Sequence, residues 1–107
     1  MDASAAAARA ALVWKALCAR PDVAALLASG ERILEVPFSF VRSGEGRCVV
    51  RGAIDCLIRR RDGSIVVAEF KTGRPSPAHQ QQLDVYVSAA RVMYPDAAVS
   101  GQLIYPA

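Results

Sequence analysis

The sequence has few of the residues that build disulfide frameworks and most metal sites. It contains three cysteines and one histidine in 107 residues, and Cys18, Cys48 and Cys56 show no CxxC spacing. An odd and unpaired set argues against both a disulfide scaffold and a structural zinc site. Apolar runs long enough to cross a bilayer are absent, and the alanine-rich start lacks the regions of a signal peptide. We therefore expect a cytoplasmic protein without a membrane partner.

Lysine is scarce as well, because Lys15 and Lys71 are the only two against eleven arginines, and the formal net charge is +3. The arginine bias has two explanations, which are the base composition of the coding DNA and a surface that binds phosphate. A hydrophobic content of 53% and a charged content of 21% are typical of an ordinary globular protein. A chain of this length predicts a single domain over residues 1–107, too small to hold a motor as well.

The first half of the chain predicts helix followed by an edge strand. Alanine and leucine favour helix over residues 3–28, with an interruption at Pro21. We expect an apolar face on this helix, formed by Leu12, Ala16 and Ala19. Residues 33–40 alternate as a strand, and Pro37 cannot donate to a ladder, so this strand should lie at the sheet edge. A turn is predicted at Ser43–Gly46.

The second half predicts a hairpin, a helix and a last strand. Residues 48–59 are nearly all apolar in the middle, which is typical of a central strand. Residues 61–63 (Arg-Asp-Gly) have the chemistry of a tight hairpin loop, and residues 64–71 form the returning strand. A helix over 76–93 and a strand over 99–105 follow, the latter parallel to the third strand. The order α-β-β-β-α-β predicts an α/β fold with a central mixed sheet flanked by helices.

The register of the predicted hairpin brings charged residues together. If residues 61–63 are the loop, Asp55 lies opposite Glu69, and Lys71 shares the face of Glu69. The preceding hairpin places Glu35 within about a residue of Asp55. We expect the opposite face to be apolar, formed by Ile54, Cys56, Ile58, Val66, Ala68 and Phe70. Three carboxylates and one lysine should therefore cluster near the middle of the sheet.

Such a cluster is costly unless its charges are balanced. A divalent cation with oxygen ligands would balance the carboxylates, could polarise a phosphodiester and could activate a water. The lysine would then stabilise developing charge. The structural alternative is a plain cross-strand ion pair between Glu69 and Lys71, with Asp55 capping a bend.

Three segments together resemble the PD-(D/E)xK nuclease superfamily: residues 52–55 (Gly-Ala-Ile-Asp), 67–73 (Val-Ala-Glu-Phe-Lys-Thr-Gly) and 82–86 (Gln-Leu-Asp-Val-Tyr). Within it, the chain is most similar to the C-terminal nuclease domain of RecB- and AddA-type helicase–nucleases, whose first strand residues 35–38 also resemble. The likeness covers nearly the whole chain and implies the restriction-endonuclease-like core. It implies an Mg²⁺-dependent DNA nuclease, with Mn²⁺ as an alternative metal. An exonuclease is expected, as a fragment of a helicase–nuclease of double-strand-break repair, with a helicase motor as partner.

The resemblance also implies a role for each site residue. Asp55, Glu69 and the backbone carbonyl of Phe70 would be metal ligands, and Lys71 and Gln82 would be catalytic. Tyr86 would contact DNA, although it could equally belong to a core stripe of the helix. For Arg74, His79 and the arginines at 59–61 the residues themselves suggest phosphate contacts. His79 could instead be a plain surface residue, and the arginine run a solvated hairpin tip.

One departure from the family pattern leaves rival functions open. Many relatives carry a histidine metal ligand upstream of the first strand, whereas His79 is the first histidine here. Either Glu35 takes that role or the chain begins after the missing helix. The rivals are a nuclease fold without activity that binds DNA or docks a protein, and a purely structural interaction domain.

Overall fold

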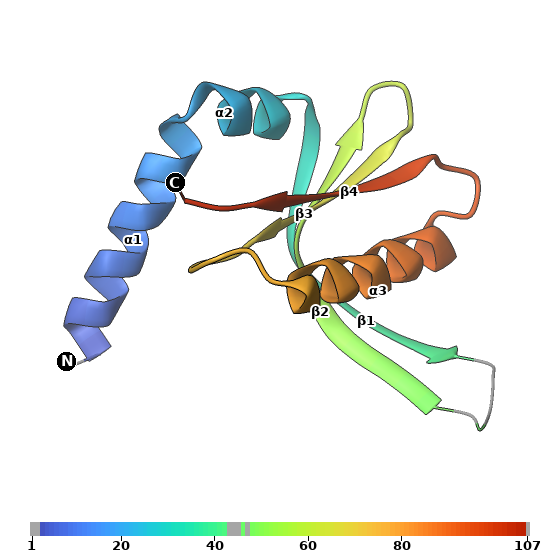
Figure 1. Cartoon of the computed structure of the whole chain (residues 1–107). Coiled ribbons are helices and arrows are strands. Elements are labelled where there is room, and N and C mark those ends of the chain that lie inside the picture. The colour runs from blue at the N-terminus through green and yellow to red at the C-terminus, as the bar shows by residue number, and fades with distance from the viewer. Residues whose placement is uncertain (1–2, 43–45, 47, 107) are drawn as a thin grey trace.

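The structure is a computed structural model, and it describes residues 3–42, 46 and 48–106. The predicted order of elements is confirmed (Figure 1): α1 (Ala3–Ala19), α2 (Pro21–Ala28), β1 (Gly30–Arg42), β2 (Cys48–Arg60), β3 (Ile65–Phe70), α3 (Pro77–Met93) and β4 (Val99–Ile104). The sheet has four strands in the order β1-β2-β3-β4. The first three strands are antiparallel and β4 is parallel to β3, as predicted. This is a mixed sheet flanked by helices, so the predicted fold class is confirmed.

Local chemistry explains the helix boundaries. Pro21 occupies the first turn of α2, where its missing N–H is harmless, and so the long predicted helix divides there. Ser76 caps α3, since its hydroxyl accepts a hydrogen bond of 3.2 Å from the N–H of Ala78. None of the described helices is long and apolar enough to span a bilayer.

The strands match the predicted positions, with small differences at their ends and the largest in β1, which spans Gly30–Arg42. β1 begins at Gly30 rather than Ile33 because its pairing with β2 continues to Arg60. β1 is an edge strand and β2 lies inside the sheet, both as predicted. At the β2–β3 turn, Gly63 has a φ of +89° and donates to the carbonyl of Arg60 at 3.0 Å. Of the other predicted turn, Ser43–Gly46, only Gly46 belongs to the described residues.

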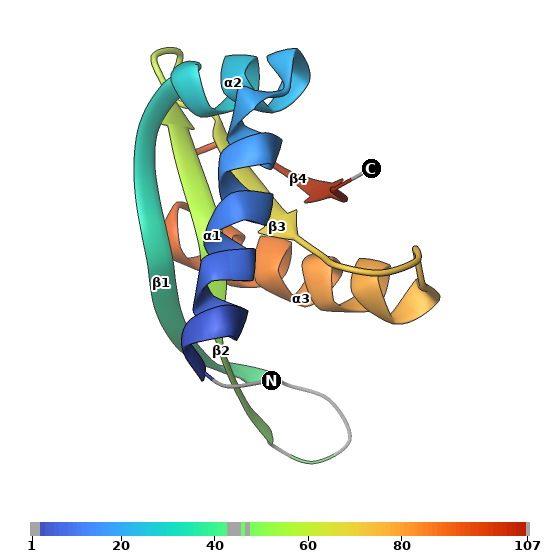
Figure 2. The same ribbon diagram turned by 90° about the vertical axis from the view of Figure 1, so that its left-hand side faces the viewer.

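Two apolar clusters cover the two faces of the sheet, and Figure 2 shows α1 in front of the sheet and α3 behind it. One cluster joins α1 and α2 to the sheet through Leu17, Val23, Leu26, Leu27, Cys56, Ile58, Val66, Ala68 and Ile104. The other joins α3 to the sheet through Ile54, Leu57, Ile65, Val67, Leu83, Val87 and Ala90. Cys56 is fully buried, and the three cysteines are free thiols. The middle of the β2–β3 hairpin is therefore enclosed from both sides.

The side-chain alternation of β1 and β2 breaks at one position, which corrects one prediction. Ile54 packs with the α3 cluster, not with Cys56 on the α1 side, so it lies on the same side as Leu57 three residues on. The break falls at Asp55, which lies opposite Glu35 in the register between the two strands. Glu35 has a φ of +49°, a left-handed conformation that residues other than glycine rarely adopt. A strand turned at this residue no longer alternates by twos across it.

The predicted apolar face of α1 is also wrong. Leu12 is 68% exposed, while the buried residue of this helix is Leu17. Helix α1 stands to one side of the sheet (Figure 1), and it meets the sheet with a different stripe from the one predicted. That stripe carries Trp14, whose ring meets the ring of Phe70 edge-on, with centroids 4.9 Å apart.

Candidate active site

Asp55 of β2 and Glu69 of β3 each accept a hydrogen bond from the main chain of the other strand, at the point where regular β2–β3 pairing stops. The described pairs run from Arg59–Ile65 to Cys56–Ala68, which is the predicted register, and one more step places Asp55 opposite Glu69. The N–H of Asp55 donates to Glu69 Oε2 at 2.8 Å, and the N–H of Phe70 donates to Asp55 Oδ2 at 3.1 Å. Each carboxylate is thus fixed by the main chain of the opposite strand. We call this reciprocal arrangement of Asp55 and Glu69 the carboxylate clasp.

The clasp places one carboxyl group deep in the protein. Glu69 is only 1% exposed, and it is the one polar or charged residue in the buried class within the described part of the chain. Burial raises the pKa of Glu69 to about 8. The N–H of Asp55 lowers this pKa, the charge and side-chain hydrogen bond of Asp55 raise it, and Lys71 lowers it by a smaller amount. Without an added cation, two neighbouring carboxylates cannot both carry their charge at low cost.

Lys71 is held by α3 rather than by a carboxylate. Its Nζ donates to Gln82 Oε1, and Gln82 Nε2 donates to the hydroxyl of Tyr86 at 3.0 Å. Gln82 and Tyr86 stand four apart on the helix, so they share a face. The ion pairs among the described residues are Arg20–Asp22 and Arg59–Glu31. The structural alternative of a Glu69–Lys71 ion pair is therefore not what this part of the chain forms.

Tyr86 takes part both in the apolar packing of α3 and in the hydrogen bonds that connect it to Gln82 and Lys71. Its ring meets Phe38 edge-on at 5.3 Å within the α3 cluster, while its hydroxyl accepts the hydrogen bond from Gln82. Burial raises the pKa of the Tyr86 hydroxyl, and the charges of Glu69 and Asp55 raise it further. Tyr86 therefore stays a neutral phenol that positions Gln82.

Gly52 leaves room for this tyrosine. A Cβ at position 52 would lie 2.8 Å from Cζ of Phe38 and 3.1 Å from Cε1 of Tyr86. We expect Gly52→Ala to lower the free energy of unfolding by about 1–2 kcal/mol, because two packed rings must move. Denaturant unfolding measures the loss. In the double variant Gly52→Ala/Phe38→Leu the nearer ring is gone. The loss of unfolding free energy in the double variant should therefore be smaller than the sum of the losses in the two single variants. Strict additivity would contradict a clash with Phe38.

Glu35 lies beside the clasp without completing a three-carboxylate cluster. Together with Trp14, Leu34 and Asp55 it lines a pocket of about 390 Å³. Among the described residues, however, no group of three or more His, Cys, Asp or Glu side chains could hold a metal ion. The predicted cluster is thus a pair made of buried Glu69 and exposed Asp55, with exposed Glu35 beside it.

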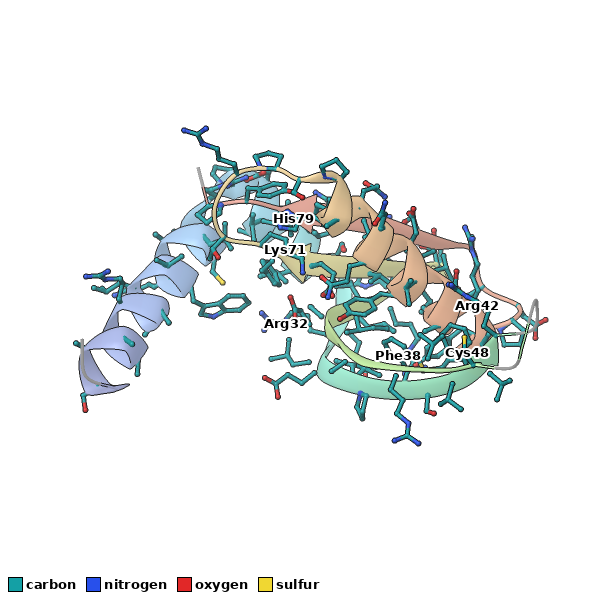
Figure 3. All side chains as sticks on the ribbon, turned by 60° about the horizontal axis from the view of Figure 1, so that its bottom comes forward. Arg32, Phe38, Arg42, Cys48, Lys71 and His79 are labelled. Atoms are coloured by element: carbon teal, nitrogen blue, oxygen red, sulfur yellow. The ribbon has the colours of Figure 1, made fainter. Side chains whose placement is uncertain are left out.

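The remaining predicted residues lie on the segment that joins β3 to α3 and in the first turn of α3. Arg74 is exposed, next to Gly73 with its φ of +80°. His79 is half-buried, and its Nδ1 lies 2.9 Å from the hydroxyl of Tyr105. Figure 3 shows Lys71 and His79 near the middle of the view, and Arg42 and Cys48 toward the side away from α1. The structure therefore gathers Asp55, Glu69, Lys71, Gln82 and Tyr86, and leaves Arg74 and His79 at the border.

Trp14 is a neighbour of the site that sequence reasoning missed. It lines the pocket shared by Glu35 and Asp55, and its ring contacts Phe70, which follows Glu69 in β3. The signal was present as a stripe with helical spacing, namely Ala6, Ala10, Val13, Trp14 and Leu17. The prediction selected a different stripe of the same alanine-rich helix, since alanine occurs on every face.

Comparison with known proteins agrees with this geometry. The family model of the PD-(D/E)XK nuclease superfamily matches residues 2–106. The chain is also 35% identical over 82 residues to "Endonuclease NucS 1" of Halobacterium salinarum (strain ATCC 700922 / JCM 11081 / NRC-1), an alignment covering 72% of this chain. That alignment covers 34% of the relative, so the chain spans about a third of its length. With a match over almost all of its residues, the chain belongs to the PD-(D/E)XK nuclease superfamily.

Proposed function

We propose that this domain hydrolyses phosphodiester bonds in DNA with the help of a divalent metal, Mg²⁺ or Mn²⁺. The observation that carries the proposal is the carboxylate clasp, which places a buried carboxylate against a second one at the end of a hairpin. Lys71, two residues after Glu69 in the sequence, lowers the pKa of Glu69 and so lies within reach of its charge. Nuclease-family membership supports the same chemistry.

The residues present fit a hard divalent cation. Asp55 and Glu69 offer carboxylate oxygens, and only one oxygen of each has a main-chain hydrogen bond. Such a cation is bound by one or two carboxylates, with waters and phosphate completing its shell. Asp55, Glu69 and the carbonyl of Phe70 would hold it, and exposed Glu35 would take the outer side of the pocket. When bound, the metal would polarise the phosphate and lower the pKa of a water.

The other site residues would act on the substrate directly or through a neighbour. Lys71 would place its ammonium against the scissile phosphate, where negative charge develops. Gln82 would keep Lys71 in place through the hydrogen bond that it accepts, and Tyr86 would in turn orient Gln82. Arg74 and His79 would contact the phosphates that flank the cleavage point. Tyr86, which is half-buried, would also contact DNA.

The wider context stays a prediction. The helicase–nuclease likeness suggests an exonuclease joined to a motor in double-strand-break repair. The relative named an endonuclease favours cuts inside a strand. A second function, an inactive nuclease fold that binds DNA or docks a protein, is favoured by the lack of a three-ligand group in the described residues.

A magnesium titration with defined DNA substrates tests the proposal. We expect Mg²⁺-dependent cleavage that falls by about 100-fold or more in Lys71→Ala, because a positive group at the phosphate is lost. Lys15→Ala removes the other lysine of the chain, on exposed α1, and should leave the rate unchanged.

The substrates also separate the possible modes. Cutting of circular single-stranded or duplex DNA indicates an endonuclease, and cutting of linear DNA alone indicates an exonuclease. Equal rates for wild type and Lys71→Ala would contradict the catalytic proposal. DNA binding that weakens with salt, without cleavage or metal binding, would support the inactive module.

A further inference from the structure

A groove runs between α1 and the end of β3, directly beside the candidate active site. Its volume is about 350 Å³. The α1 side of the groove is an apolar stripe, Ala6, Ala10, Val13 and Leu17, and the β3 side is Phe70, Lys71 and Thr72. Among the described residues that line it, two are basic, Arg9 and Lys71, and none is acidic. The lining of the groove is therefore mostly apolar, and the charged side chains in it are both positive.

Trp14 connects this groove to the carboxylates. Its side chain lines the groove and also the pocket that holds Glu35 and Asp55. The indole is 41% exposed, although its ring rests edge-on against Phe70 at an angle of 79°. This contact fixes the ring plane and leaves one part of the ring open to a ligand. An exposed and oriented aromatic ring is what a stacking platform requires.

We propose that Trp14 and this groove form a nucleobase-binding subsite, in which one unpaired base of the substrate stacks on the indole. The inference rests on the proposed function, because the phosphate of the same nucleotide would lie at Lys71. The groove shares Lys71 with the active site, so a base in the groove and a phosphate at the clasp can belong to one nucleotide.

The chemistry of the groove selects a nucleotide over an apolar peptide. A nucleotide has a flat apolar base and an anionic phosphate, which matches an apolar groove whose two charged residues are basic. A base within a duplex has both faces covered by its neighbours, so a base must leave the stack to reach the indole. The subsite therefore favours unpaired ends, loops or single strands over continuous duplex.

Trp14 is the only tryptophan in the chain, so tryptophan fluorescence reports on the surroundings of this one side chain. In metal-free buffer, where no cleavage is expected, we expect oligodeoxythymidylate to quench the emission through stacking. An oligonucleotide of the same length made of abasic sites carries the same phosphates without bases, and should bind without quenching. Equal quenching by both, or quenching by neither, would overturn the proposal.

Substitutions extend the test to affinity. Trp14→Ala should weaken binding of oligodeoxythymidylate by about 5- to 100-fold, the usual range for loss of one stacked base. It should leave binding of the abasic oligonucleotide unchanged, and Trp14→Phe should retain most of the affinity. Leu12→Ala is the matched control, because Leu12 is 68% exposed on the same helix and does not line the groove. Equal losses with both oligonucleotides would overturn the subsite.

The subsite and the proposed function fail in different ways. Cleavage that depends on Asp55 and Lys71, without base-dependent quenching, removes the subsite and leaves the nuclease. Base-dependent quenching without metal-dependent cleavage leaves the subsite and removes the nuclease. Gel filtration tests whether a second copy of the chain occupies the groove instead. If Trp14→Ala changes the oligomeric state but not the base-dependent affinity, the groove holds a second copy and the proposal is wrong.

Discussion

Asp55→Asn is expected to reduce metal-dependent DNA cleavage by about 1,000-fold or more while the protein stays folded. Asparagine has nearly the same shape, and its side-chain oxygen can still accept the hydrogen bond from the N–H of Phe70. What disappears is the negative charge that the proposed metal requires. The hairpin should therefore close as before, and the catalytic loss should come from the metal site alone.

Two measurements separate this loss from unfolding. Calorimetry should show Mg²⁺ binding in the wild type and none, or far weaker binding, in Asp55→Asn. Thermal unfolding of the metal-free variant should occur at the same temperature or higher, because the like charge beside Glu69 is gone. Asp96→Asn serves as the control, since Asp96 is exposed near the end of α3, away from the clasp. Unchanged cleavage in Asp55→Asn would rule out the proposed ligand.

Glu69→Gln is expected to stabilise the metal-free protein at pH 8 and to abolish cleavage, two effects of opposite sign. Burial raises the pKa of Glu69 from 4.5 to about 8, so the folded state binds this proton more tightly than the unfolded state. The stabilisation from protonation is complete below about pH 4.5 and is lost as the pH rises to about 8. The expected loss is on the order of 3 kcal/mol in the wild type. Glutamine stays neutral and should show no such loss.

Denaturant unfolding at several pH values between 5 and 8, with a chelator present, measures this difference. The two stability curves should meet near pH 5 and separate as the pH rises. Added Mg²⁺ should stabilise only the wild type, and binding should release protons, because the carboxylate must ionise to hold the cation. Glu31→Gln removes an exposed carboxylate that pairs with Arg59, and its curve should stay parallel to that of the wild type. If the stability curve of Glu69→Gln ran parallel to that of the wild type, Glu69 would not titrate in this pH range.

The sequence predicted the cross-strand position of Asp55 and Glu69, though not the hydrogen bonds of the clasp, because turn chemistry controls register. An Arg-Asp-Gly turn allows few hairpin geometries, so counting back from Gly63 was enough to place Asp55 opposite Glu69. The same counting failed for Ile54. Strict alternation of side chains along a strand does not predict that Glu35 adopts a left-handed backbone. That conformation changes the face of the sheet on which the neighbouring residues pack.

The part of the site contributed by α1 could not be predicted for a different reason. A helix with alanine on every face offers several equivalent apolar stripes, and only tertiary packing selects one of them. The structure selects the stripe with Trp14 and Leu17, and not the one with Leu12. Likewise, the hydrogen bond between Lys71 and Gln82 depends on where α3 lies against β3. Local pattern identifies both residues and leaves their contact to the fold.

The carboxylate clasp makes assembly of the site inseparable from closure of the hairpin. Each acidic side chain is oriented by an N–H group of the other strand, so neither is positioned until β2 and β3 have come together. A nascent or partly unfolded chain contains the same residues but not the pair. If the domain cuts DNA as proposed, a chain whose hairpin has not closed would therefore lack the site that does the cutting.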